Sequence, residues 1–244
     1  MADAPLMLRP LRPYRVPCHT TGAPGAGIST TMDTMKITRH LHACVEINHH
    51  GYTLIIDPGS FGVPESLATA DAVLITHGHP DHLDQQALIL AHRANPEMVI
   101  YAPAFLADEL PVEVHAVDHG QSFTIGGIPV EVVGSKHAMI THAQDVPENI
   151  GYLIGGRILH PGDNFQPIRD VDVALVPVNG PWVKMLDVEA WLKKFPPKHF
   201  VGIHDGIVNE HGLAINTKIL TLLADKYGST YLPLAPGDSL ELGA

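Results

Sequence analysis

The chain has 244 residues, 45% of them hydrophobic, and a formal net charge of −11 with histidines counted as neutral. This length and composition fit one large domain with a sizeable core. Lys and Arg together number only 15, too few for a surface that neutralises phosphate backbones, so we expect no nucleic acid partner. No stretch approaches the roughly 18 consecutive apolar residues of a membrane span, so we expect no membrane partner.

Cysteine content and the N-terminal stretch indicate a cellular location. Cys18 and Cys44 are the only cysteines, too few for a disulfide framework, which favours a reducing compartment. The first residues include Arg9, Arg12 and Arg15 but are interrupted by prolines, and they lack the apolar central region of a secretory signal. We therefore expect a cytoplasmic protein.

Residues 1–34 are rich in Pro, Gly, Thr and Ala and have little periodicity, which is typical of a flexible extension. We expect the folded domain over residues 35–244. Short strands, mostly separated by Gly, Pro or Asp, are predicted over residues 36–47, 51–56, 71–76, 98–102, 112–117, 121–125, 128–134, 150–155, 157–160, 171–177, 199–203, 229–233 and 237–241.

Helical spacing occurs over residues 85–93, 188–195 and 213–227. Each of these segments is short enough to pack on a sheet. Because strands and helices do not strictly alternate, the pattern predicts two sheets packed face to face with helices outside.

The most informative segment is Thr-His-Gly-His-Pro-Asp-His-Leu-Asp at residues 76–84, right after a short apolar run. Seventeen histidines make some clustering inevitable, but four ligand-type residues in six positions after a strand favour a metal site. Imidazole and carboxylate are ligands that zinc and similar metals prefer. His77 and His79 project the same way and suit one ion, while Asp81 and His82, beyond the turn, suit a second.

Two ions need further ligands downstream. His137, Asp163 and His204 each follow a short apolar run, so each is expected at a strand end, where a ligand is held rigidly and the adjoining loop leaves room for substrate. Taken singly, two of them have ordinary alternatives. His137 has a second histidine five residues on, and Asp163 lies in a Pro-Gly-Asp-Asn sequence that suits a turn.

In this order, from about Lys36 to Leu242, these residues resemble the metallo-β-lactamase superfamily. The resemblance implies an α/β (α+β) fold, a four-layer αββα sandwich. It implies one metal held by His77, His79 and His137, a second held by Asp81, His82 and His204, and Asp163 bridging the two. Asp57, in Leu-Ile-Ile-Asp-Pro-Gly, is implied to support the metal loop by hydrogen bonding.

Three differences from other members of the superfamily narrow down the branch that this chain resembles. Members that destroy β-lactams with two zincs typically have Cys where Asp163 stands, and flavin-linked di-iron members have Glu where His79 stands. The basic arm of tRNA-processing nucleases is also missing. The segments 36–44 and 53–59 resemble the branch of L-ascorbate-6-phosphate lactonase and uncharacterised metal-dependent hydrolases. His42 followed by Ala matches that branch's first-strand motif, although the usual glycine before this His is absent.

A segment beginning at Pro177 also resembles that branch, in the loop that follows the strand after the bridging Asp. Asn179, Gly180 and Trp182 are therefore expected to line the substrate pocket. The alternative, that Trp182 only covers the edge of the core, is equally compatible with the sequence because aromatic residues often serve packing.

The expected chemistry is hydrolysis of a small ester, lactone or phosphoester. Two divalent ions, zinc first and manganese or iron as alternatives, would lower the pKa of a bridging water towards neutrality and polarise the substrate oxygen. Asp81 and Asp163 would bind metal and orient the water or accept its proton, and His42 would protonate the leaving group. No Gly-x-Ser-x-Gly motif of a serine hydrolase is present.

Two other functions stay open on the sequence. One is a metal-dependent binding or sensing protein of the same fold without turnover. The other is a mononuclear iron enzyme that metabolises thiols, which would bind about one iron per chain. A small molecule is the expected partner, and the sequence leaves oligomeric state open, a homo-oligomer included.

Overall fold

The computed structural model describes residues 34–243. The extension expected over residues 1–34 therefore lies, apart from its last residue, outside the described part of the chain. Among the described residues, no helix is both long and apolar enough to cross a membrane.

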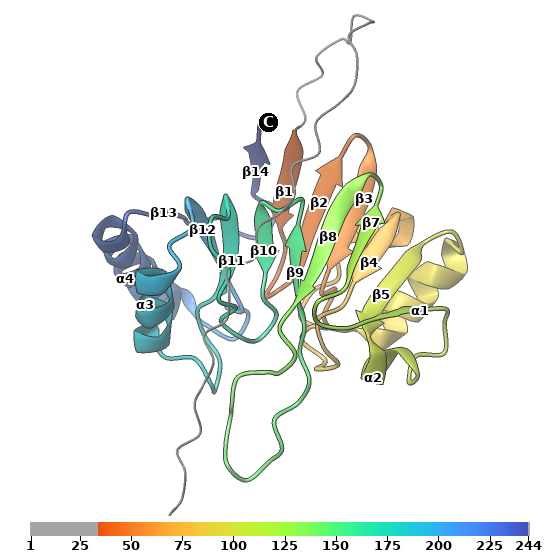
Figure 1. The fold of residues 1–244 in the computed structure, drawn as a ribbon, viewed down its shortest axis with the longest axis horizontal. Helices are drawn as coiled ribbons and strands as arrows, with labels where there is room; N and C mark the ends of the chain where they lie inside the picture. The colour runs from red at the N-terminus through yellow and green to blue at the C-terminus, as the bar shows by residue number, and fades with distance from the viewer. Residues whose placement is uncertain (1–33, 244) are drawn as a thin grey trace, which may run out of the picture. The chain divides into compact units, whose positions relative to one another are not determined.

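Two seven-stranded sheets face one another (Figure 1). The first has the strand order β14 (Ser239–Leu242), β1 (Met35–Arg39), β2 (Val45–His49), β3 (Tyr52–Ile56), β4 (Ala72–Leu74), β5 (Val99–Pro103) and β6 (His115–Val117). The second has the order β13 (Thr230–Leu232), β12 (His199–Ile203), β11 (Val173–Pro177), β10 (Ile158–His160), β9 (Gly151–Ile154), β8 (Ile128–Val133) and β7 (Ser122–Ile125).

Helices cover the outer face of each sheet (Figure 1). The 3-10 helix η1 (Glu65–Thr69) and the helices α1 (Gln85–Ala94) and α2 (Ala104–Ala107) share a core with the first sheet. On the second sheet, α3 (Met185–Lys194) and α4 (Glu210–Tyr227) do the same. A third core of Val, Ile and Leu side chains fills the space between the sheets. The four-layer αββα sandwich is thus confirmed.

Because side chains alternate along a strand, one strand can contribute side chains to two different hydrophobic cores. In β4, Ala72 and Leu74 face the core between the sheets, whereas Val73 faces the core beneath the helices. Successive side chains of a strand point to opposite faces, so a central strand covered on both sides has an apolar run without polar positions. β11 is likewise buried at every position.

The single strand predicted over residues 36–47 was wrong. The chain forms β1, turns over residues 40–44 and returns antiparallel as β2. Cys44 N–H donates to Leu41 O at 3.0 Å, and His42 has φ 58°, which a continuous strand does not allow. The predicted helices over 188–195 and 213–227 begin earlier, at Met185 and Glu210, and α2 and η1 were not predicted.

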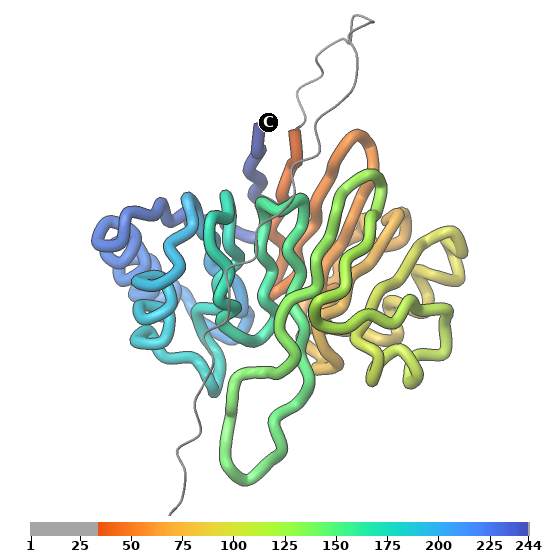
Figure 2. The backbone as a smooth tube through the Cα atoms, in the orientation of Figure 1, coloured from red at the N-terminus to blue at the C-terminus, as the bar shows by residue number. Residues whose placement is uncertain are grey.

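Strand direction gathers several loops at one edge of the sandwich. β3, β4 and β5 are mutually parallel, as are β10, β11 and β12, and β8 runs in the same direction as β10 because both are antiparallel to β9. Residues 134–150, between β8 and β9, form the long green loop that extends beyond the sheets in Figure 2. Carboxyl ends of parallel strands commonly line ligand sites.

Candidate metal centre

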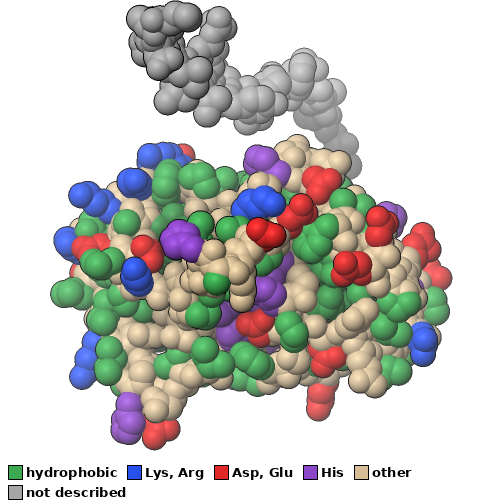
Figure 3. All heavy atoms as spheres, turned by 90° about the horizontal axis from the view of Figure 1, so that it is seen from below, with side chains coloured by type: hydrophobic (Ala, Val, Ile, Leu, Met, Phe, Trp, Pro, Cys, Tyr) green, Lys and Arg blue, Asp and Glu red, His purple; other side chains and the backbone are tan. Residues whose placement is uncertain are grey.

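All seven predicted metal ligands lie in loops at this edge. His77, His79, Asp81 and His82 are between β4 and α1, while His137 follows β8, Asp163 follows β10 and His204 follows β12. Figure 3 shows histidine and acidic side chains together in a hollow on the face seen there. The structure therefore brings together residues that are up to 127 positions apart in the chain (204 − 77).

The first group consists of His77, His79, His137 and Asp163. One ligand-type atom from each lies within 4.8 Å of the others. His77 Nε2 is 3.0 Å from His79 Nδ1, and His137 Nε2 is 3.1 Å from Asp163 Oδ2. Three imidazoles and one carboxylate at this spacing suit zinc, which takes four ligands of these types.

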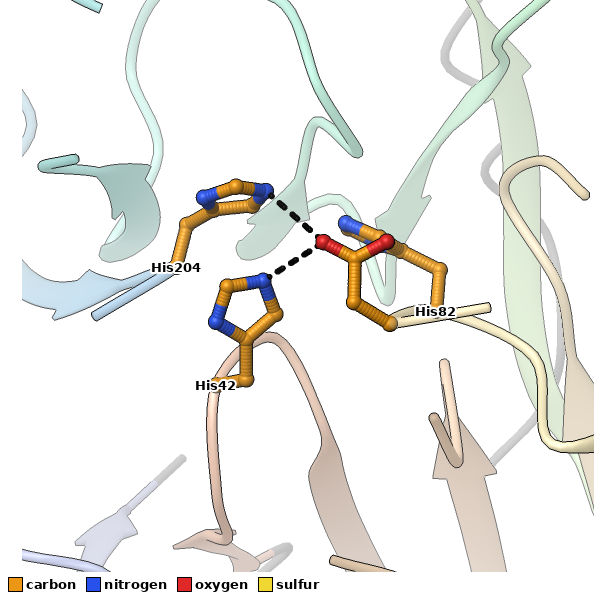
Figure 4. A group of neighbouring side chains, drawn as sticks. His42, His82 and His204 are labelled. Atoms are coloured by element: carbon orange, nitrogen blue, oxygen red, sulfur yellow. Dashed lines mark hydrogen bonds and ion pairs between the residues drawn. The ribbon is translucent and has the colours of Figure 1, made fainter. Parts of the chain in front are cut away.

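The second group consists of His42, Asp81, His82 and His204, again within 4.8 Å. Figure 4 shows the rings of His42 and His204 directed toward one carboxylate, with the ring of His82 beside it. Asp81 Oδ2 lies 2.9 Å from His42 Nε2 and 3.5 Å from His204 Nε2. Asp81 is also the most accessible member, with 24% of its side chain exposed, so solvent reaches the centre beside it.

Asp163 lies between the two groups. Its Oδ2 is 3.1 Å from Nε2 of both His137 and His204, and its Oδ1 is 3.0 Å from Nε2 of His82. With His77 Nε2 also 3.8 Å from its Oδ2, the carboxylate faces two histidines of each group. This is the position that the resemblance implied for a bridging ligand.

Three histidines are oriented by hydrogen bonds at Nδ1. The Nδ1–H of His82 donates to Asp57 Oδ2 at 2.7 Å, and that of His137 donates to Ala138 O at 2.6 Å. His77 Nδ1 is 3.0 Å from the hydroxyl of Thr76, which itself donates to Asp57. With the proton on Nδ1, each ring presents the lone pair of Nε2 to the centre, as a metal ligand must.

His42 has the opposite arrangement. The backbone N–H of Gly206 donates to its Nδ1 at 3.0 Å, so in the neutral ring the proton is on Nε2. Nε2 then donates to Asp81. A nitrogen that carries a proton has no lone pair for a metal. The hydrogen bonds therefore favour His42 as a donor to Asp81, although its distance alone would suit a ligand.

The charges and the burial of the side chains favour cation binding at the centre. Burial alone would raise the pKa of Asp163, but His82, His137 and His204 hold it well below its usual value. Burial also opposes ionisation of Asp81, yet the hydrogen bond from His42 and the nearby histidines lower its pKa to about 2. Burial lowers the pKa of His77 and His79. Burial opposes a charge on His82, but Asp163 and Asp57 raise its pKa well above the usual value. At neutral pH two ionised carboxylates thus lie beside the neutral rings of His77 and His79.

Asp57 makes the hydrogen bonds expected of a supporting residue. It is fully buried directly after β3 with φ 51°, and its Oδ1 accepts the N–H of Thr76 at 2.8 Å. Its Oδ2 accepts from the Thr76 hydroxyl and from His82. One carboxylate therefore fixes both the start of the motif loop and the ring of His82.

The segment expected to line the substrate pocket borders both groups. The ring of Trp182 lies 5.5 Å from that of His137 and 5.8 Å from that of His204, between ring centroids. Gly180 has φ 144°, and a Cβ there would lie 3.3 Å from His204 Cε1, so glycine allows this loop to pass close to His204. Trp182 is only 8% exposed, so it also packs, and Asn179 is half-buried.

Two supporting residues were not predicted from the sequence. Asn149 is buried in the loop before β9, where its Oδ1 accepts the N–H of Asp163 at 2.8 Å. His160 is buried and donates from Nε2 to Ala43 O at 2.8 Å, which ties β10 to the turn that carries His42. An isolated Asn or His near a strand has no sequence signal for such contacts.

Comparison with known proteins gives the family. Residues 36–204 match a model described as the Beta-lactamase superfamily domain. Protein Rv0786c of Mycobacterium tuberculosis is 35% identical over 181 residues, which are 71% of this chain and 85% of that protein. A UPF0173 metal-dependent hydrolase of Anoxybacillus flavithermus is 29% identical over 216 residues, covering 71% of this chain and 95% of the relative.

A solved structure has the same fold. Igni18, a metallo hydrolase from the archaeon Ignicoccus hospitalis, superimposes with a TM-score of 0.68 at 17% identity, covering 86% of this chain and 99% of that one. The family match spans well over half of the chain and includes all seven residues of the two groups that the resemblance singled out. The chain therefore belongs to the metallo-β-lactamase superfamily.

Proposed function

We propose that this metal-dependent hydrolase uses two divalent ions, zinc before manganese or iron, to split a small ester, lactone or phosphoester with water. The observation that carries the proposal is the pair of ligand groups with Asp163 between them. A single-ion enzyme would not need the second group.

Two buried atoms indicate that the residues fit cations. His82 Nε2 and Asp163 Oδ1 are 3.0 Å apart, yet neither has a hydrogen-bond partner within residues 34–243. Buried polar atoms are normally satisfied. A cation that both atoms contact would satisfy them, and histidine and aspartate are the donor types that zinc accepts.

The reaction needs no side-chain nucleophile. Bound divalent ions lower the pKa of water towards neutrality and polarise the carbonyl or phosphoryl oxygen. Asp81 and Asp163, ionised at neutral pH, would orient the attacking water and accept its proton. Asn179, Gly180 and Trp182 would border the bound substrate, because their loop touches the His137 and His204 rings.

The identity of the residue that protonates the leaving group remains a prediction. His42 was the first candidate, but burial lowers its pKa and its Nδ1 already accepts from Gly206. A neutral imidazole N–H donates a hydrogen bond readily, but it is too weak an acid to transfer its proton to a leaving group. We therefore propose that His42 holds Asp81 in place.

The proposal also covers the cellular location of the enzyme and the size of its substrate. We keep the cytoplasm as its location, which is supported by the low cysteine content and by a free, buried thiol at Cys44. The substrate is a small molecule, because the ligand groups lie in a hollow between loops.

Metal analysis and a substrate screen test the function. Protein purified without added metal should contain about two divalent ions per chain and hydrolyse at least one lactone, thioester or phosphodiester. His77→Ala or Asp163→Ala should lose bound metal and at least about 10³-fold in turnover. His211→Ala, an exposed histidine on α4, is the matched control and should change neither.

Three results would contradict the proposal. Turnover that persists in a metal-free Asp163→Ala variant would exclude the two-ion reaction. Tight binding of small molecules by the metal-loaded protein without any hydrolysis would favour the binding or sensing function, and about one iron per chain would favour the thiol-metabolising enzyme.

A further inference from the structure

Three large apolar side chains are exposed beside the second ligand group. Leu41 is 42% exposed, Phe61 43% and Ile207 62%. Leu41 immediately precedes His42, and Ile207 lies three residues after His204. We call these three residues the apolar rim. Exposed apolar surface that borders a polar site commonly marks where a ligand binds.

Close packing holds two members of the apolar rim, Phe61 and Leu41, in place. The Phe61 ring meets the His42 ring edge-on, with centroids 4.7 Å apart. A Cβ at Gly206 would lie 2.7 Å from Phe61 Cδ2, and a Cβ at Gly62 would lie 2.4 Å from Leu41 Cδ1. The two glycines thus let the apolar side chains lie directly on the backbone of neighbouring loops. A single imidazole ring separates Phe61 from Asp81.

Cationic side chains are missing from the loops on this side. Residues 40–44, 57–64, 76–84 and 204–209 contain neither Lys nor Arg. The nearest guanidinium, Arg39, is buried and paired with Asp205. Lysines border the other side of the centre, where Lys136 precedes His137. A phosphate or carboxylate group placed over the apolar rim, away from the ions, would find no free Lys or Arg in these loops, because Arg39 is already paired with Asp205.

We propose that the apolar rim binds a hydrocarbon part of the substrate, so that the substrate is an ester or lactone with an alkyl or aryl substituent rather than a phosphorylated sugar. This inference rests on the proposed hydrolase function and specifies its substrate class. In the reaction the acyl C–O bond breaks, and water supplies the hydroxyl of the acid and the proton of the alcohol. The substituent on the ring or acyl chain lies against Phe61.

A series of γ-lactones tests the proposal with the full-length, metal-loaded protein. γ-Butyrolactone, γ-hexalactone and γ-octalactone share one reacting group and differ in the length of the alkyl substituent, and acid release at constant pH gives kcat/KM. On a half-open surface we expect about a twofold gain per methylene, or about 16-fold from butyrolactone to octalactone. A γ-lactone with a carboxylate at the same ring carbon should react more slowly than butyrolactone.

Variants connect the chain-length dependence to the apolar rim. Phe61→Ser and Ile207→Ser should each reduce the octalactone-to-butyrolactone ratio of kcat/KM to below about fourfold. Leu222→Ser is the matched control, since Leu222 is 66% exposed on α4, and should keep the full ratio. Metal content measured on each variant confirms that the centre is intact.

The outcomes separate this inference from the proposed function. Hydrolysis of butyrolactone without chain-length dependence, or with dependence that survives both rim substitutions, overturns the inference and leaves the hydrolase function standing. Failure to hydrolyse any ester, lactone, thioester or phosphodiester overturns both. If the rim substitutions instead convert an oligomer to a monomer by size-exclusion chromatography, the apolar rim is an interface between copies and the inference is wrong.

Discussion

The two ring nitrogens of His42 have different partners, and this difference separates it from the other histidines of the centre. His77, His82 and His137 each have an Nδ1 partner that can accept a proton, so Nε2 is free to ligate. At His42, by contrast, a backbone N–H donates to Nδ1. By distance each of the four belongs to one of the two ligand groups, whereas the direction of the hydrogen bonds gives His42 a different role from the others.

Substitution at His42 tests this assignment. His42→Gln retains an N–H donor and should keep two metals per chain and turnover within about tenfold of wild type. His42→Ala removes the donor, leaves Asp81 free to move, and should lose about 10- to 100-fold in kcat while still binding metal. Metal analysis and a pH profile of kcat provide the measurement.

Other results at His42 would support different roles. Loss of one metal from both variants would make His42 a ligand. Equal losses of kcat in both variants, together with loss of the alkaline limb of the pH profile, would make it the leaving-group acid.

Sequence and structure agree best for residues whose chemistry is local. The four ligand-type residues of the H-x-H-x-D-H segment occupy six positions, so the sequence alone predicts that they lie close together. Residues such as Asn149 and Phe61 act through contacts with distant segments, Asp163 and His42 respectively, and neither has a distinctive sequence context. Such contacts depend on the folded chain and could not be predicted from spacing.

At the scale of elements, Asp172 connects three strands at the edge opposite to the centre. It directly precedes β11, and it pairs with Arg157, before β10, and with Lys198, before β12, whose Nζ is 2.6 Å away. Hydrogen bonds from Lys198 and Arg157 lower the pKa of Asp172. The ion pairs join the starts of parallel strands that carry Asp163 and His204 at their other ends.

Asp172→Asn should therefore destabilise the fold by about 1 kcal/mol at pH 7, a modest loss because Lys198 is largely exposed to solvent. Since the folded-state pKa is lowered, the contribution is fully present above the unfolded-state pKa of about 4 and is lost as the pH falls through the folded-state value. Urea unfolding at pH 7 and at pH 3 measures the difference. Asp225→Asn, an exposed residue on α4, should show none. An equal loss at both pH values would contradict the ion-pair origin.

Element prediction failed where a polar turn interrupts an alternating pattern. Residues 36–47 alternate as one strand would, but the chain reverses at His42 in a left-handed conformation. Hydrogen bonds from His204 N–H to His42 O and from Gly206 N–H to the His42 ring support this conformation. Both partners lie more than 160 residues away, so local propensity does not reveal the turn. By contrast, α1 was predicted closely because its helical spacing lies within one continuous segment.

At the scale of the whole domain, the candidate centre joins two sheets whose facing sides are packed mainly through apolar side chains. Loops of the first sheet supply His42, His77, His79, Asp81 and His82, and loops of the second supply His137, Asp163 and His204. Each ligand group contains members from both sheets. An ion in either group would therefore hold the two sheets together at this edge.

Metal removal should for that reason lower thermal stability as well as turnover. Ions that bind only the folded state stabilise it by about 2.7 kcal/mol per site at 100 times Kd. With two ions in a domain of this size we expect chelation to lower Tm by about 10–20 °C, reversibly on readdition of zinc. Scanning calorimetry with and without chelator measures the shift. Asp163→Ala, which lacks the ligand between the groups, should melt at the same temperature in both conditions, because it has no ions to lose. A chelator-induced shift of equal size in that variant would mean that the stabilising ions bind elsewhere in the protein.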